Sequence, residues 1–225
     1  ILQVGYDKMI NIDSGCDHED LFYPLPSDRL EPESNCFTHY DALRSEFLTH
    51  PETEAVDYTT GTVFNSWMNL LPVDENNNQK ADVHEIYCTP EAFDIYGFKV
   101  ISQNSDGKYG IWMTESFKKI FDDSPYMQRI LTGPSGEIGY TGVIEDFPNS
   151  GIPYMGDSKP AGYINVLPKE YVNGYHLAYI IRTNGDHEKA RKVIVEAYEK
   201  ISGCRVVDPK HIGRESKYLG EILEG

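Results

Sequence analysis

The stretch from Ala190 to Ile201 has the clearest periodicity in the chain. Its apolar side chains recur at i, i+3, i+4, i+7, i+8 and i+11: Ala190, Val193, Ile194, Ala197, Tyr198 and Ile201. Lysine and glutamate stand between them, so the pattern predicts an amphipathic helix with one buried face. Gly203 follows, and glycine readily takes the left-handed conformation that ends helices. A β-rich run over Tyr175–Arg182 precedes the helix, and we expect a short strand over Arg205–Val207 after it.

The first third of the chain has a related order of elements. We expect a strand over Ile1–Val4, a polar, turn-rich stretch over Asp13–Pro32, and then a helix over Phe37–Thr49. The apolar face of that helix would be formed by Phe37, Tyr40, Leu43, Phe47 and Leu48. Pro51 ends it, because the residue before a proline is pushed out of the helical region, and Glu54–Tyr58 fits a short strand.

The middle of the chain differs from both ends, since short candidate strands alternate there with turn signals. Ile138–Ile144 alternates like a strand, and one short helix is predicted over Glu115–Phe121 with Thr114 as its N-cap. A terminal helix through Tyr218 and Ile222 would finish the chain. The order of elements predicts an α/β (α+β) protein: a small α/β lobe from residues 1–65 plus 170–225, interrupted by a β-rich insertion over 66–169.

The charge of the chain argues against a nucleic-acid partner. The 36 Asp and Glu outnumber the 20 Lys and Arg, which gives a formal net charge of −16. Nucleic-acid binding needs clustered basic side chains, and here they are scattered, so we expect no nucleic-acid partner. The sequence also lacks a run of roughly 18 apolar residues, the length that a membrane-spanning helix needs.

Residues that could carry chemistry are few. The run Cys16–Asp20 (CDHED) could hold a metal, but no second ligand pair stands at a defined spacing, so a solvated acidic loop is the competing interpretation. No phosphate-binding or nucleophile motif occurs, and we expect no catalytic residue, no cofactor and no metal. The cysteines, Cys16, Cys36, Cys88 and Cys204, are interpreted either as buried thiols or as including one bridge, with Cys16–Cys36 as its candidate.

Several phrases of the sequence, taken in order, resemble a known family. They are Tyr87–Phe98 (YCTPEAFDIYGF), Ile111–Phe121 (IWMTESFKKIF) and Tyr140–Ser150 (YTGVIEDFPNS). The strand Tyr175–Arg182 with the helix Asp186–Ser202, and the opening Gly5–Lys8, fit the same series. Together they resemble the extracytoplasmic domains of MacB/FtsX/Lol-type permeases of ABC transporters, in the form common in the Bacteroides group.

This resemblance implies a fold, a function and a set of partners. The fold would be a porter-like α/β lobe with an inserted, mainly β, Sabre-like subdomain. The function would be non-catalytic, coupling cytoplasmic ATP hydrolysis to mechanical work outside the membrane in efflux, lipoprotein or peptide handling. The partners would be the flanking transmembrane helices, a second permease copy, a cytoplasmic ABC ATPase and a periplasmic adaptor or membrane-fusion protein. The chain would then be the periplasmic part of an inner-membrane protein.

Two other functions and one candidate surface complete the expectations. The many tyrosines leave open a secreted or surface glycan-binding module, and the acidic run near His18 leaves open a metal-dependent hydrolase. If the chain docks a partner or cargo, we expect the turn after the Ile138–Ile144 strand to contribute, since loops on rigid scaffolds often carry binding. The candidate docking residues are Asp146, Phe147, Pro148, Asn149, Ser150 and Ile152. A purely structural turn is the alternative.

Overall fold

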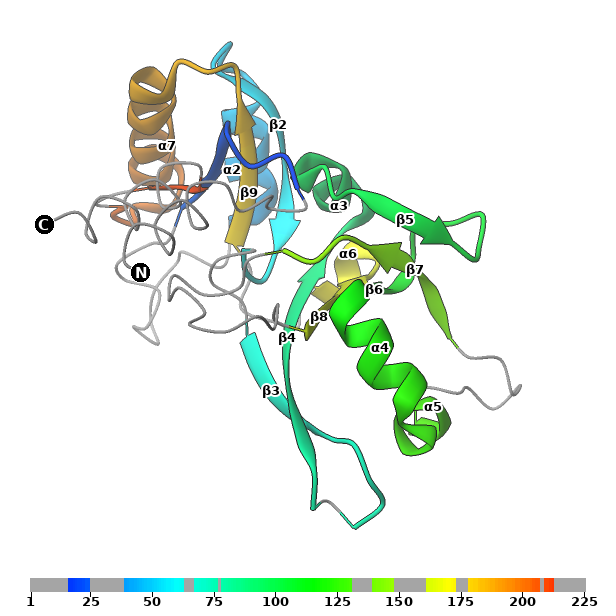
Figure 1. Cartoon of the computed structure of the whole chain (residues 1–225). Coiled ribbons are helices and arrows are strands. Elements are labelled where there is room, and N and C mark those ends of the chain that lie inside the picture. The colour runs from blue at the N-terminus through cyan, green and yellow to red at the C-terminus, as the bar shows by residue number, and fades with distance from the viewer. Residues whose placement is uncertain are drawn as a thin grey trace, which may run out of the picture.

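A mixed β-sheet of ten strands runs through the part of the chain that the structure describes (Figure 1). The computed structural model describes residues 16–24, 39–62, 67–76, 78–130, 139–147, 161–172, 178–206 and 209–212. The strands are β1 (Leu21–Tyr23), β2 (Thr53–Thr59), β3 (Trp67–Pro72), β4 (Lys80–Cys88), β5 (Val100–Gln103), β6 (Gly110–Thr114), β7 (Tyr140–Ile144), β8 (Ala161–Val166), β9 (Ala178–Thr183) and β10 (Lys210–His211). Their order is β10-β1-β9-β2-β4-β8-β6-β7-β5, with β3 paired to β4 beside this path.

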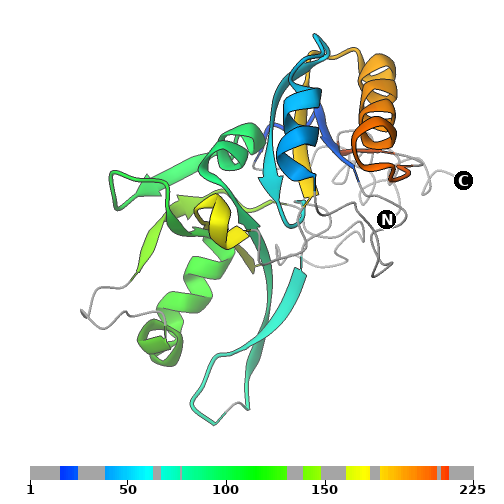
Figure 2. The same ribbon diagram turned by 180° about the vertical axis from the view of Figure 1, so that it is seen from behind.

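Helices cover both faces of this sheet. They are α2 (Tyr40–Phe47), α3 (Pro90–Tyr96), α4 (Glu115–Asp123), α5 (Pro125–Ile130), α6 (Lys169–Val172) and α7 (His187–Ser202). Both views place α2 and α7 together against β2 and β9, while the hairpin of β3 and β4 projects away from the rest (Figure 1, Figure 2). The β4–β8 and β6–β7 pairs are parallel and the other pairs are antiparallel, so the α/β (α+β) class expected from the sequence is confirmed.

Alternating residues of the strands divide the core into two sides. On β9, Tyr179 and Ile181 pack with α2 and α7, whereas Ala178 and Ile180 pack on the other side with α3. The insertion repeats this division, because Met113 of β6 packs with α4 and α5 while its neighbour Trp112 joins the α3 side. Side chains two residues apart share a face of a strand, so α2, α7, α4 and α5 lie on one face and α3 on the other.

The sheet is narrowest where β2 meets β4. Within the described ranges, Thr59 and Cys88 are the single register pair there, supported by the backbone hydrogen bonds from Thr60 N to Tyr87 O (2.9 Å) and from Thr89 N to Tyr58 O (3.2 Å). We call this place the seam. It joins a strand of the expected 1–65 segment to a strand of the expected 66–169 insertion, but the α3 core crosses it. The two-lobe division of the chain therefore stays a prediction.

Several sequence-based expectations need correction. The stretch expected to be polar and turn-rich contains β1, whose three residues are all buried. The sequence did not predict this strand, because a run of three residues is too short to show an alternating pattern. The middle holds α3 and α5 besides the single helix expected there, and α6 begins at the boundary expected at residue 169. Helices of four to seven residues are too short to show a helical pattern. Arg205 and Val206 are not in a strand, and β10 forms later in the chain. The expected strand Ile1–Val4 and the helix through Tyr218 and Ile222 lie outside the described residues.

The cysteines divide between the two interpretations. Cys16 and Cys88 are buried thiols, and burial raises the pKa of Cys88 above its usual range. Cys204, in contrast, is disulfide-bonded. The proposed Cys16–Cys36 bridge is wrong, because Cys16 belongs to no disulfide.

Candidate functional site

The described part of the expected docking turn is buried. Asp146 accepts hydrogen bonds from the backbone N of Ser116 and from its Oγ, both at 2.8 Å, so its carboxylate caps the N-terminus of α4. Phe147 lies in the α3-side core. Pro148, Asn149, Ser150 and Ile152 lie outside the described residues, and a docking role for this turn stays a prediction.

The acidic run before β1 forms structural contacts. Arg182 of β9 donates to Asp17 Oδ2 at 2.9 Å and also to the backbone carbonyls of Asp17 and Ile95. His187 Nε2 lies 2.7 Å from Asp20 Oδ1, which ties the run to the start of α7. His18 Nδ1 lies 3.3 Å from the carbonyl of Cys16. Within the described ranges, no group of three His, Cys, Asp or Glu side chains is arranged to hold a metal ion.

A polar pocket of about 330 Å³ lies at the seam. Its centre is Asp57, which is 5% exposed and joins three elements. Arg44 of α2 donates to Asp57 Oδ2 at 3.1 Å, while Thr89, the N-cap of α3, donates from its hydroxyl to Oδ1 at 2.8 Å. The backbone N of Tyr58 donates to the same Oδ1 at 2.8 Å. One buried carboxylate thus holds α2, β2 and α3 together.

A second, exposed aspartate extends this network. Asp41 accepts hydrogen bonds from the Tyr58 hydroxyl, at 2.7 Å, and from Lys169 of α6. The hydrogen bond from Lys169 has the larger effect and that from Tyr58 the smaller, and together they hold the pKa of Asp41 below its usual value. Lys169 also lies 4.9 Å from the ring centroid of Tyr58, a cation–π distance. The wall of the pocket is completed by Pro90, Glu91, Tyr109, Pro168 and Glu170. Each of these aspartates already has a basic partner, and the polar side chains of the pocket hold α2, β2, α3 and α6 together.

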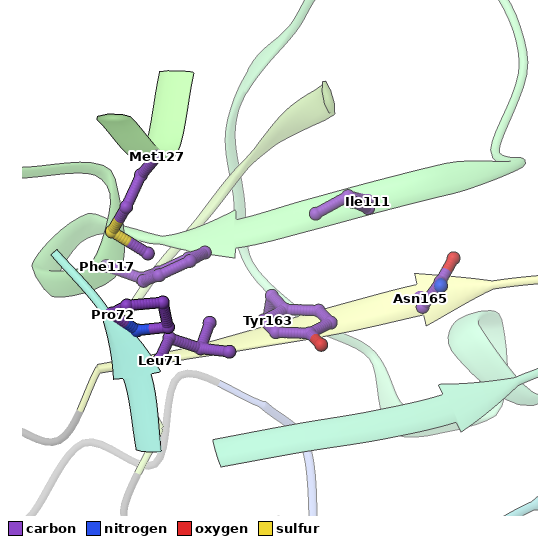
Figure 3. Close-up of a pocket in the computed structure, with 7 residues that line it drawn as sticks. All are labelled: Leu71, Pro72, Ile111, Phe117, Met127, Tyr163 and Asn165. Atoms are coloured by element: carbon purple, nitrogen blue, oxygen red, sulfur yellow. The ribbon is translucent and has the colours of Figure 1, made fainter. Parts of the chain in front are cut away.

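An apolar pocket of about 290 Å³ opens on the sheet face that α4 and α5 cover (Figure 3). Its lining comes from β3, β6, β8, α4 and α5: Leu71, Pro72, Ile111, Phe117, Met127, Tyr163 and Asn165. Figure 3 shows Leu71, Phe117 and Met127 gathered at one end, whereas Tyr163 and Asn165 follow β8 toward the other. The pocket therefore has an apolar end and a polar end.

Glu85 of β4 lies next to the polar end, because it pairs in the strand register with Tyr163, which lines the pocket. The Tyr163 hydroxyl donates a hydrogen bond to Glu85 Oε2. Burial, reinforced by the neighbouring carboxylate, raises the pKa of Tyr163 above its usual range. Tyr163 therefore stays protonated, and its hydroxyl donates to Glu85.

The phrases that carry the family resemblance fold as one connected unit. In the first, Thr89 caps α3 by accepting from Ala92 N at 3.2 Å, and Gly97 ends the helix at φ 61°. In the second, Thr114 caps α4, and its hydroxyl also accepts from the backbone N of Gly162 at 3.0 Å. The third supplies Asp146, which binds Ser116 of the second. Thr89, Thr114 and Asp146 of these phrases thus serve as helix caps.

Aromatic side chains bind the same phrases to one another. The ring of Phe93 lies 4.8 Å from that of Trp112 and 5.2 Å from that of Phe98. Phe98 in turn lies 5.8 Å from Phe147 and 5.0 Å from Tyr96. All five are buried. Tilted and stacked rings at these distances stabilise one another beyond the burial of their area, so the resemblance rests on residues that determine the fold.

Sequence reasoning found neither pocket. Asp57 and Glu85 both lie in strand-like runs where an alternating pattern suggests an outward-facing side chain. Asp57 lies in a pocket because α2 and α3 enclose it, and Glu85 lies beside one because α4 and β3 pack next to its neighbour Tyr163. The one available signal is a carboxylate in a β-rich run that also contains tyrosines.

Comparisons with known proteins give a limited result. No protein-family model matches the chain, and no curated protein matches it. Among solved structures it is similar to the extracellular domain of the noncanonic ABC-type transporter YknZ from Gram-positive bacteria, at 11% sequence identity and a TM-score of 0.45. That match covers 84% of this chain and 97% of the other. A similarity this low establishes neither a common family nor a common function, and a Bacteroides-type origin stays a prediction.

Proposed function

We propose that the chain is a non-catalytic, extracytoplasmic domain of an ABC-transporter permease of the MacB/FtsX/Lol type. It transmits movement between flanking transmembrane helices and a partner or cargo outside the membrane. ATP is hydrolysed elsewhere, by a cytoplasmic ATPase that acts on the permease. A second permease copy and a periplasmic adaptor are the further partners of this proposal.

The observation that carries the proposal is the convergence of the three resembling phrases on one unit. Chance matches scattered along a chain have no reason to meet in space. Here Asp146 of the third phrase caps the helix of the second, and Phe98 of the first packs on Phe147 of the third. The resemblance therefore concerns a set of mutually supporting contacts.

Two features of the described residues fit the proposed setting. The first and last described strands pair with each other, Phe22 opposite His211 and Tyr23 opposite Lys210. A domain inserted between two membrane helices needs its first and last elements side by side. Cys204 is disulfide-bonded, and disulfides persist chiefly in oxidising, extracytoplasmic compartments. No helix in the described ranges is apolar and long enough to cross a bilayer.

The arrangement of contacts also suits a part that transmits force. The hydrogen bonds of Asp57 and the α3-side core both cross the narrow seam. A displacement of one half of the sheet is therefore transmitted to the other half. Buried, close-packed contacts deform little, and a displacement at one edge therefore reaches the far edge. β10, the last described strand, lies at one end of the sheet order, and β5 lies at the other.

The experiment requires the native gene. We expect its sequence to encode an apolar span shortly before Ile1 and further spans after Gly225. A cysteine placed at Asn104, in the exposed turn after β5, should react in whole cells with a maleimide that cannot cross the inner membrane. Deleting the domain from the permease should abolish transport and leave ATP binding by the complex unchanged. A gene without flanking spans, or transport that survives the deletion, would contradict the proposal.

One observation favours the second candidate, a glycan-binding module. Tyr109, which is 58% exposed, lines the polar pocket beside Glu91 and Lys169. Exposed aromatic rings next to charged side chains are suited to sugar binding, because the ring packs on the sugar while the charged groups bind its hydroxyls. A glycan array probed with the 225-residue chain tests this, and binding that Tyr109→Ala abolishes would favour it over the permease proposal.

A further inference from the structure

The carboxylate of Glu85 lies beside the apolar pocket of Figure 3, because it accepts a hydrogen bond from the hydroxyl of Tyr163, which lines the pocket, and no basic side chain among the described residues pairs with it. Phe117 and Met127, which form the hydrophobic end with Leu71, are themselves buried, but the pocket of about 290 Å³ between them opens to solvent. A cavity of roughly 300 Å³ lined by apolar side chains, with a few placed polar groups, is typical of a binding site.

The polar end has unused hydrogen-bonding capacity. Within the described residues, Glu85 has one partner, the Tyr163 hydroxyl, which occupies one lone pair of a carboxylate that can accept about four hydrogen bonds. Asn165, one step further along β8, makes no side-chain hydrogen bond in the described part of the chain. Both belong to the sheet face that forms the pocket floor, because Glu85 pairs with Tyr163, and Asn165 lies two residues beyond Tyr163.

Two basic residues of the helices that border the pocket are already paired. Lys118 of α4 donates to Asp122, and Arg129 of α5 lies 2.7 Å from Glu75 on the loop between β3 and β4. Within the described residues Glu85 has no basic partner, so its carboxylate is open to a positive charge on a binding partner. The formal net charge of −16 also favours a basic partner, because an acidic surface attracts basic partners over long range and repels acidic ones.

We propose that this pocket docks a protein partner through two adjacent side chains, one apolar and one basic. The apolar side chain enters between Leu71, Phe117 and Met127, and the Lys or Arg beside it binds Glu85. Asn165 is placed to bind the backbone of the same segment. This deepens the proposed function by naming the chemistry of the partner that the domain docks. Met127 suits the role, since a flexible thioether adapts to side chains of different shape.

Three blocked dipeptides test the charge selection: acetyl-Phe-Arg-amide, acetyl-Phe-Gln-amide and acetyl-Phe-Glu-amide. Each is titrated into the 225-residue chain labelled at the methionine methyl groups, with the Met127 methyl resonance as the readout. We expect the Arg peptide to bind about two- to fivefold more tightly than the Gln peptide, as for a partly exposed charge pair. The Glu peptide should bind most weakly.

The variant Glu85→Gln should make the Arg and Gln peptides bind equally without weakening the Gln peptide. Glu91→Gln, which removes a carboxylate from the polar pocket instead, should leave the preference for the Arg peptide unchanged and serves as the matched control. A second measurement needs no variant: raising the salt concentration should weaken the Arg peptide alone. The fold of Glu85→Gln is checked by its methyl spectrum.

Equal binding of the Arg and Gln peptides to the unaltered chain, or an unmoved Met127 resonance with all three, would overturn the inference. The assay uses neither membrane nor ATP. Selective binding of the Arg peptide by a chain whose gene encodes no membrane spans would therefore support this site and contradict the permease proposal. A gene with flanking membrane spans whose chain shows no preference for the Arg peptide would contradict the proposed site and leave the permease proposal standing.

Discussion

Replacing Asp57 with asparagine removes the charge that braces the seam while keeping the shape of the side chain. The carboxylate accepts from Tyr58 N and Thr89 Oγ1 through Oδ1, and from Arg44 through Oδ2. Asparagine can keep the two Oδ1 bonds, but its NH₂ group faces the Arg44 guanidinium as a second donor. The loss is therefore concentrated on the Arg44 contact.

The size of the effect follows from burial on the two sides of the pair. A hydrogen bond to a charged group contributes about 1.5–3 kcal/mol. The side chain of Asp57 is 7% exposed and that of Arg44 is 37% exposed, so water recovers part of the loss on the arginine side only. We expect Asp57→Asn to lower the free energy of unfolding by about 2 kcal/mol. In a chain of this length that shifts the Tm down by about 4–8 °C.

Urea unfolding measures the change, which should appear as a lower midpoint at an unchanged m value. Asp41→Asn is the matched control, because Asp41 also binds a basic side chain but is 77% exposed. Its cost should stay below about 0.5 kcal/mol. If the two variants differ by less than that amount, a buried carboxylate does not hold the seam together, and the reasoning fails.

Two further predictions concern packing and pH. Gly142→Ala places a Cβ 2.5 Å from a ring carbon of Trp112 and 2.5 Å from the carbonyl of Ser102, so it should cost about 1–3 kcal/mol. Gly107→Ala meets nothing within 4 Å and should change the urea midpoint little. Burial lowers the pKa of His211, so the folded chain binds fewer protons there than the unfolded chain. Stability should fall as the pH drops below about 6.5, and His211→Gln should flatten that slope in urea titrations from pH 8 to 5; an unchanged slope would contradict this.

The sequence by itself determined the elements whose signals are local. α7 runs from His187 to Ser202 with Gly203 at φ 70°, where the apolar period and a terminal glycine predicted them. Thr114 caps α4, and β2 covers the expected strand, for the same reason. A helix cap or an amphipathic face depends on residues within a few positions, so one chain segment is enough to predict it.

Tertiary structure alone decided what lies far apart in sequence and close in space. β1 became a central, buried strand because β9 and β10 flank it, although its own three residues show no pattern. Asp146 became a helix cap 30 residues away from Ser116, and Glu85 came to accept a hydrogen bond from Tyr163, 78 residues later. Such contacts depend on the sheet order, and the order depends on the packing of all the strands at once, which no local window of residues contains.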